Sequence, residues 1–472
     1  MLTAAQLIRP GEERWDSARA AWNLAIDQRP AVVAQPHDAD GFAAAVNFAR
    51  ENGLRVAVQT EGHGAGALAG VGEDKLLLKT GRMTGAEIDA ENRRARVSAA
   101  AKWRDVSALT SPRGLAPLSG LSAEVGVVGY TLGGGLGWLS RKHGLACNSV
   151  LAAEVITADG KLVRADRSNE PDLFWALRGG GGSFGAVTAL EFELYPADEL
   201  YAGMFAWPWE RTADVLHAWR EWVSGLPDEL STLARIIQLP RLRDVPEPVR
   251  GRQLVVIEAA YLGAAGSAGE LLRPLRDLRP ELDTFATVPP AALGRLHMEP
   301  EDPVPYAAGG QMLDELPPAA IDAITEAAGP GSGSPLISFE LRHLGGALAE
   351  PPPDAGALAA LDEAFLTNGV GVITAPRAST AINTQLDVLA DALKPWDSGV
   401  RLTNFVDLPT DARTFYPPET FDRLQEVKRR YDPDNLFLAN HPIDPEPGGH
   451  GVLPREERQC VASLPAVPST NR

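Results

Sequence analysis

The chain has 472 residues, with 44 Lys and Arg against 62 Asp and Glu, so its formal net charge is −18. Such an acidic chain is a poor candidate for nucleic-acid binding, because sequence-independent affinity for polyanions comes from clustered basic side chains. No stretch reaches the roughly 18 uninterrupted apolar residues of a membrane span, and no secretory signal pattern opens the chain. With two cysteines, Cys147 and Cys460, we expect no disulfide framework, no structural metal site and a cytoplasmic location.

The first two hundred residues predict short strands that alternate with helices. A helix capped by Asp38 or Asp40 ends near Gly53, and a hairpin turns at Asp159-Gly160. A short helix before Gly179 is stopped by four glycines. The predicted strands are 31–34, 54–58, 75–79, 93–99 and 186–194, and the hairpin is 154–165. The short helix before the glycines is 169–177, and a further helix is predicted at 103–110.

The character of the sequence changes near Pro196. Longer amphipathic helices and apolar runs at 254–261 and 336–341 predict a second domain, built on an antiparallel sheet with helices on one side. A charged helix follows at 421–431, and the residues beyond Pro445 have little to bury, so 445–472 are expected to form a flexible tail.

Three glycine clusters occur in the first domain, at 62–66, 133–137 and 179–185. One such cluster alone is more often a tight turn than a cofactor loop, but three in one domain favour a cofactor, because glycine lets the backbone approach a ligand closely. None of them is a Walker loop or a dinucleotide fingerprint. The third also contains a Gly-x-Ser-x-Gly elbow at Ser183, with His441 as a possible partner, but the elbow needs strand then helix and this chain predicts the reverse order.

The amino-acid sequences of several segments, and their order along the chain, resemble those of the FAD-linked oxidases of the berberine-bridge-enzyme-like group, in the vanillyl-alcohol oxidase/PCMH superfamily. The segments are VGVVGYTLGGGLGWLSRKHGL (125–145), VITADGKLV (155–163), EPDLFWALRGGGGSFGAVT (170–188) and the stretch 403–443. The resemblance implies an α+β fold of two domains: a PCMH-type FAD-binding domain, 1–196 plus 408–444, and a substrate domain, 197–407. The substrate domain is the antiparallel sheet backed by helices.

The resemblance also implies which residues hold FAD. His63 corresponds to the histidine that bonds the 8α carbon of the flavin. Many relatives add a bond from a cysteine, but Ser122 stands at that position, and a hydroxyl does not replace a thiolate nucleophile, so a single covalent bond through His63 is predicted. The remaining implied flavin contacts are Gly62, Gly64, Val125, Gly126, Gly129, Tyr130, Gly133, Gly134, Gly135, Gly179, Gly180, Gly181, Val187 and Asn440.

Three residues are candidates for roles in the reaction. Val125 occupies the position that, in relatives, governs access of oxygen to the flavin, although ordinary packing is also compatible with it. Tyr130 replaces a histidine of the family, and a packing role and a chemical role are equally open. The third candidate is Glu340, the proposed base: strand alternation puts it on one face with Arg342 and away from Phe339, Leu341 and His343. A solvated surface ion pair is the alternative.

The usual base is missing, because the segment that carries two tyrosines in many relatives reads Leu402-Thr403-Asn404-Phe405. We therefore expect an FAD-dependent oxidoreductase that takes a hydride from a small organic molecule, a natural product or an alcohol or amine, rather than from a sugar. Oxygen is the expected electron acceptor, with hydrogen peroxide as product. A dehydrogenase with another acceptor and a non-catalytic flavin-holding protein remain alternatives.

Overall fold

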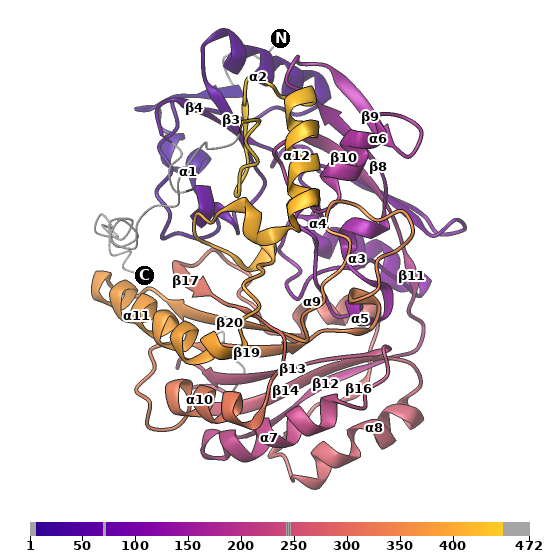
Figure 1. Cartoon of the computed structure of the whole chain (residues 1–472), viewed down its shortest axis with the longest axis vertical. Helices are drawn as coiled ribbons and strands as arrows, with labels where there is room; N and C mark the ends of the chain where they lie inside the picture. Colours follow the sequence, from indigo (N-terminus) through magenta and orange to yellow (C-terminus); the bar gives the residue numbers. More distant parts are fainter. Residues whose placement is uncertain (1–5, 69–71, 242, 244, 246, 447–472) are drawn as a thin grey trace.

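Three β-sheets and the helices around them form the α+β fold (Figure 1). The structure is a computed structural model that describes residues 6–68, 72–241, 243, 245 and 247–446. The expected tail beyond residue 446 and Cys460 lie outside the described residues, whereas Cys147 is a buried free thiol. Within the described ranges, no helix combines the length and apolarity that a bilayer crossing requires.

The first sheet has the strand order β1-β2-β4-β3-β21, with parallel pairing from β2 to β21. Helix α2 (Ala39–Glu51) covers it with Phe42, Val46 and Ala49, and the Asp38 side chain caps the helix by accepting a hydrogen bond from Gly41 N. The predicted helix and its cap are thus confirmed. The strands are β1 (Leu7–Ile8), β2 (Val32–Ala34), β3 (Arg55–Gln59), β4 (Lys75–Lys79) and β21 (Phe437–Leu438).

The second sheet is antiparallel, with the order β5-β6-β10-β8-β9. Its inner face forms the largest core together with helices α3 (Trp103–Thr110), α4 (Val127–Leu132) and α6 (Pro171–Leu177). The predicted hairpin is confirmed, but its first strand begins at Val150 rather than Glu154 because the ladder with β10 extends further. The strands are β5 (Ala86–Asp89), β6 (Arg94–Ser98), β8 (Val150–Ile156), β9 (Leu162–Asp166) and β10 (Ala186–Glu193).

The third sheet is the long antiparallel one, in the order β15-β12-β14-β13-β19-β20-β17, with β16 beside β12 and β18 beside β20. Helices α7 (Thr212–Val223), α8 (Ala265–Asp277), α10 (Pro318–Ala328) and α11 (Pro376–Leu393) pack on its outer face (Figure 1). The strands are β12 (Leu200–Pro208), β13 (Leu230–Gln238), β14 (Gln253–Leu262), β15 (Leu282–Asp283), β16 (Ala286–Thr287), β17 (Tyr306–Gly309), β18 (Met312–Leu313), β19 (Ser338–His343) and β20 (Phe365–Val372).

The C-terminal segment returns to the first sheet. Helix α12 (Pro418–Tyr431) places Lys428 in a fully buried ion pair with Asp432, and the Lys428 ammonium also donates to Ser183 O at 2.7 Å. The Asp432 carboxylate accepts hydrogen bonds from the N–H groups of Leu436 and Phe437, the residues that enter β21. This buried pair therefore fixes the last strand next to β3, the strand that leads into the His63 loop.

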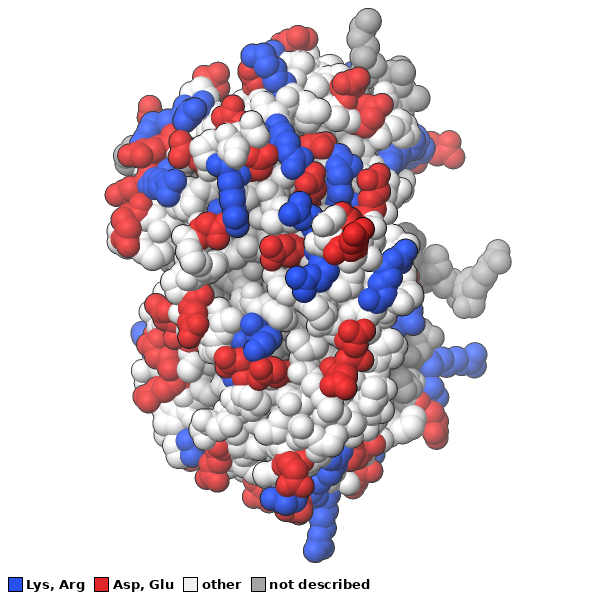
Figure 2. Space-filling view, turned by 90° about the vertical axis from the view of Figure 1, so that its right-hand side faces the viewer, with Lys and Arg blue, Asp and Glu red and all other residues white. Residues whose placement is uncertain are grey.

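The shorter elements connect these layers. They are α1 (Trp15–Arg19), α5 (Ser140–His143), α9 (Leu293–Leu296) and the two-stranded pair β7 (Leu115–Ala116) with β11 (Tyr195–Pro196). On the face drawn in Figure 2, acidic and basic side chains are interspersed and lie more densely in the upper half than in the lower half.

Candidate active site

The loop that follows β3 carries His63 and presents free backbone donors. No residue of the described chain accepts a hydrogen bond from the N–H groups of residues 62–64, and Gly62 adopts a φ of +91°, which favours glycine. The loop is held from outside: Asn440 Nδ2 donates to Gly64 O at 3.0 Å, and Tyr306 O–H donates to His63 O at 2.9 Å. Unpaired, fixed donors of this kind suit an anionic group such as a pyrophosphate.

The His63 imidazole is stacked on Trp22, with ring centroids 4.4 Å apart and planes 19° from parallel. Burial, together with the charge of Lys102, lowers the pKa of His63 to about 3, so the ring is neutral at physiological pH. No group in the described ranges forms a hydrogen bond with its ring nitrogens. A neutral imidazole with unoccupied nitrogens is a competent nucleophile.

A second loop, 122–126, lies against the first and leads into helix α4. Lys102 Nζ joins the two loops, at 3.4 Å from Glu61 and 3.2 Å from Glu124, and a side chain at Gly126 would crowd Thr60. Within helix α4 the neighbours of Gly129 are buried, yet Gly129 is exposed and a Cβ there would point into open space. Val125 is half-buried beside it. The exposed Gly129 thus offers an open strip of backbone, in a segment that begins against the His63 loop, and such a strip is compatible with the flat ring of a flavin.

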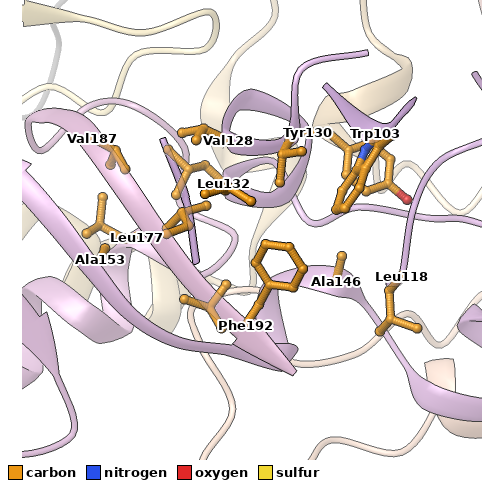
Figure 3. Packing of buried hydrophobic residues seen from close by; sticks show 14 of the residues in the cluster. Trp103, Leu118, Val128, Tyr130, Leu132, Ala146, Ala153, Leu177, Val187 and Phe192 are labelled. Atoms are coloured by element: carbon orange, nitrogen blue, oxygen red, sulfur yellow. The ribbon is translucent and has the colours of Figure 1, made fainter. Parts of the chain in front are cut away.

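Tyr130 points the other way, into the core. Figure 3 shows its ring beside Trp103, at a centroid distance of 5.4 Å. A Cβ at Gly120 or Gly135 would strike the tyrosine ring, and its buried hydroxyl has no hydrogen-bond partner within the described chain. Burial raises the pKa of the phenol well above its ordinary value. Of the two roles left open for Tyr130, the structure therefore favours packing over chemistry.

Several predicted flavin contacts have backbone donors that are already paired within the protein, or are buried in a strand. The N–H groups of Gly133, Gly134 and Gly135 donate to Gly129 O, Thr131 O and Asn404 Oδ1, and those of Gly179 and Gly180 donate to Leu177 O and Ala176 O. Val187 is buried in strand β10. The donors of the five glycines are already paired and the side toward a Cβ is filled by protein atoms, so their N–H groups are not available to FAD. Contact of these six residues with the flavin by packing stays a prediction.

The Gly133–Gly135 turn is held by the segment that lacks the family's tyrosines. Asn404 accepts from Gly135 N at 2.8 Å and donates to Tyr130 O at 3.1 Å, while Thr403 donates to Gly133 O. This segment, the 3-10 helix η9 (Thr403–Phe405), therefore holds the C-terminal end of helix α4 and the turn that follows it by hydrogen bonds. Its structural role was not predicted, since the contact joins residues about 270 positions apart.

The third cluster divides into packed and open glycines. Gly181 has a φ of +74°, and a Cβ at Gly181 or Gly182 would meet no atom within 4 Å, although Gly181 N donates to Leu132 O. Ser183 is buried, and its Oγ accepts a hydrogen bond from Ile443 N at 3.1 Å. A helix precedes Ser183 and a strand follows it, so the serine-hydrolase alternative does not fit.

A cluster of buried charges lies on the inner face of the third sheet. Glu340 and Arg342 share this face, as predicted, with Nη2 of Arg342 at 2.6 Å from Glu340 Oε1. Leu233 and Ala260 on the same face join the core of the second sheet, which also contains helix α4, so the charged face is turned toward the half of the molecule that carries His63. Both members of the pair are buried, which excludes the solvated surface pair considered above.

His297 links Glu340 to a second carboxylate. Its Nε2 lies 3.0 Å from Glu340 Oε2 and its Nδ1 lies 2.6 Å from Glu258 Oε2. Arg235 Nη1 donates to Glu258 at 2.7 Å, and Asn368 Nδ2 donates to Glu340 at 3.2 Å. The chain thus arranges three cationic or potentially cationic groups around two buried carboxylates, and the more exposed Glu299 lies 3.4 Å from His297 Nε2.

The neighbours of Glu340 control its charge. Burial alone would raise the pKa of Glu340, but the positive charges of Arg342 and His297 bring it far below its usual range. Burial and Arg235 oppose protonation of His297, whereas Glu258 and Glu340 outweigh them and raise its pKa. Glu340 is therefore a fixed anion, better suited to accepting a hydrogen bond than to taking up a proton.

Two further features were not predicted from the sequence, the buried carboxyl of Asp407 and a cavity between the two halves of the molecule. Burial raises the pKa of Asp407 to about 7, and its backbone carbonyl packs against Gly66 of the His63 loop. In the described ranges, no group forms a hydrogen bond with the Asp407 carboxyl. A cavity of about 120 Å³ lies where the two halves meet and is lined by Ser122, Glu124, Arg295, Met298 and Glu299, among others. No sequence signal distinguishes these groups, because each depends on contacts between distant segments.

Comparison with protein families finds two matches. Residues 30–166 match the model of an FAD binding domain, and residues 403–444 match the model described as berberine and berberine like. The second match contains η9, α12, β21 and Asn440.

Individual proteins agree with these matches. (R)-6-hydroxynicotine oxidase from Paenarthrobacter nicotinovorans is 27% identical over 459 residues, covering 93% of this chain and 97% of that protein. Glucooligosaccharide oxidase from Sarocladium strictum is 34% identical over 225 residues, 46% of this chain and 45% of that protein. The crystal structure of 6-hydroxy-D-nicotine oxidase from Arthrobacter nicotinovorans superposes with a TM-score of 0.82 at 26% identity, covering 93% of this chain and 98% of that one.

Proposed function

We propose that this chain, a berberine-bridge-enzyme-like, FAD-linked oxidoreductase of the PCMH-type superfamily, is an oxidase with FAD bonded to His63. It would take a hydride from a small organic substrate and pass the electrons to oxygen, giving hydrogen peroxide. The observation that carries the proposal is His63 itself: a neutral imidazole with unoccupied nitrogens, in a loop of unpaired N–H groups.

The residues present fit FAD at this place. The N–H groups of residues 62–64 would hold the pyrophosphate, and His63 would hold the ring beside Val125 and the exposed Gly129. When bound, FAD supplies a hydride acceptor and a route for two electrons to oxygen. Ser122 offers no thiolate, so a single covalent bond is proposed. Gly126 packs against Thr60 and Asn440 holds Gly64, so both keep the His63 loop in place, while the open Gly181 stays a proposed flavin contact.

The substrate would lie between this strip and the charged face of the third sheet. Glu340 is an anion anchored by Arg342, so it can accept a hydrogen bond from an N–H or O–H group of the substrate and orient the adjacent carbon. The pKa of Glu340 is too low for it to serve as an efficient base at neutral pH. We therefore revise its predicted role from base to positioning acceptor.

This arrangement favours amines among the expected substrates. Oxidation of an alcohol needs a group that removes the hydroxyl proton, and Glu340 is poorly suited to that step. A neutral amine can lose a hydride from the adjacent carbon without prior loss of a proton, because the nitrogen lone pair stabilises the developing positive charge. The name of the relative that covers nearly the whole chain, (R)-6-hydroxynicotine oxidase, also points to a nitrogen-containing small molecule.

The proposal is tested with the purified protein. Its visible absorbance is recorded before and after acid precipitation, and peroxide formation is then measured with secondary amines, alcohols and oligosaccharides. We expect a yellow precipitate, loss of the acid-stable colour in His63→Ala, and peroxide with an amine. A colourless protein would refute the proposal. Flavin that is reduced by substrate without air but reoxidised only slowly would instead identify a dehydrogenase.

A further inference from the structure

Trp22 contacts both the ring and the loop of His63. Besides the stack of the two rings at 4.4 Å, the backbone N–H of Trp22 donates to Glu61 O at 2.8 Å. The indole is 7% exposed, so its position is fixed by the surrounding protein. The stack covers one face of the imidazole and restricts rotation of the ring about its bond to the Cβ atom.

The next residue connects this contact to the third sheet. Asn23 Nδ2 donates to Tyr306 O at 3.0 Å, and its Oδ1 accepts from Tyr306 N at 3.2 Å. Tyr306 in turn donates its hydroxyl to His63 O at 2.9 Å. His63 is thus held at its ring by Trp22 and at its backbone by Tyr306. Asn23 links the two, because it follows Trp22 in the chain and its side chain hydrogen-bonds the backbone of Tyr306.

A positive charge completes the arrangement. Lys102 Nζ lies 5.9 Å from the centre of the Trp22 ring and is paired with Glu61 and Glu124. Lys79, on β4, donates to Ala20 O and to Gln59 next to the loop. Lys102 is the group whose charge disfavours a protonated His63. The carboxyl groups of Asp407 and Glu299 face Tyr306 and, after burial, further raise the pKa of its phenol.

We propose that Trp22 and Tyr306 are positioning residues for covalent attachment of the flavin, holding one nitrogen of the His63 ring toward the 8α carbon. This inference rests on the function proposed above. Attachment forms one bond, between the imidazole nitrogen and the 8α carbon, and breaks one N–H and one C–H bond. Two protons and two electrons are released, and oxygen accepts them as hydrogen peroxide.

Three variants test the inference: Trp22→Met, which keeps bulk but loses the aromatic plane, Trp22→Phe, which keeps the plane, and Tyr306→Phe, which loses one hydroxyl. Full-length protein from riboflavin-starved cells is mixed with FAD, and acid-stable flavin is followed by absorbance and by the mass of the intact chain. We expect attachment to slow at least about tenfold in Trp22→Met, because misorientation of a reacting group is costly. Tyr306→Phe should slow it less, and Trp22→Phe should retain most of the wild-type rate. Leu24→Ala, at an exposed site in the same segment, is the matched control.

The pH dependence separates positioning from general loss of structure. With the stack removed, His63 becomes better solvated and more easily protonated, so the attachment rate of Trp22→Met should fall at mildly acidic pH where that of the wild type stays level. Attachment at the wild-type rate in Trp22→Met would overturn the inference. If that variant does not fold, a wild-type rate in Tyr306→Phe would overturn the two-sided arrangement. Wild-type protein without acid-stable flavin would refute the proposed function instead.

Discussion

Arg342 Nη2 lies 2.6 Å from Glu340 Oε1, and both residues are buried on the face of the third sheet that is turned toward the His63 half of the chain. On the far side of Glu340, His297 bridges to Glu258 and Arg235. A charge network of this kind is stable only while its members are matched, because each ion has been taken out of water.

Removal of one member should therefore be costly. We expect Glu340→Ala to destabilise the fold by about 3–5 kcal/mol, because Arg342 and His297 would be left buried without their carboxylate. Glu340→Gln should be milder, since the amide still accepts from Arg342. The thermal unfolding midpoint measures both effects, with Glu301→Ala, whose carboxyl is largely exposed, as control. An unchanged midpoint in Glu340→Ala would contradict the burial of the network.

Asp407 should make stability depend on pH in the opposite sense to a salt-bridged acid. Its pKa is raised from the usual 3.8 to about 7, so its contribution to stability is fully present below pH 4 and is lost as pH rises through 7. Asp407→Asn should therefore raise the unfolding midpoint at pH 8 more than at pH 5. Equal changes at the two pH values would show that the carboxyl is not desolvated as the structure indicates.

Val125 should control the reaction with oxygen. It is half-buried just before α4, the helix that carries the exposed Gly129, so a larger side chain would restrict the space left for oxygen beside the proposed flavin. We expect Val125→Leu to slow reoxidation by air about tenfold or more, a change of roughly 1.4 kcal/mol in the barrier. Reduction by substrate without air should be unchanged. Stopped-flow absorbance measures both rates, and equal reoxidation in variant and wild type would remove this role.

Local sequence patterns predicted most of the elements. Strand β4 and helix α3 match their predicted bounds, and the cap at Asp38 was among the expected ones, because periodicity and capping chemistry are local properties. The pairing of Glu340 with Arg342 on one face also followed from the two-residue repeat of a strand.

Long-range contacts account for what the sequence could not show. The Gly133–Gly135 turn resembled a cofactor loop, yet its donors are taken by neighbours in the chain and by Asn404. His297, Glu258 and Arg235 meet Glu340 only through the register of three antiparallel strands and a following helix. Trp22 carries no recognisable motif, and its importance follows from the stack on His63 alone.

The identity of the flavin-bearing residue decides the account most directly. Digestion of the wild-type protein with trypsin releases residues 56–75, which contain His63 as their one histidine. We predict that mass spectrometry finds this peptide with FAD attached and that fragmentation places the added mass on His63. Recovery of the unmodified peptide from a protein whose flavin is released by acid, or is bonded to another residue, would contradict the central claim.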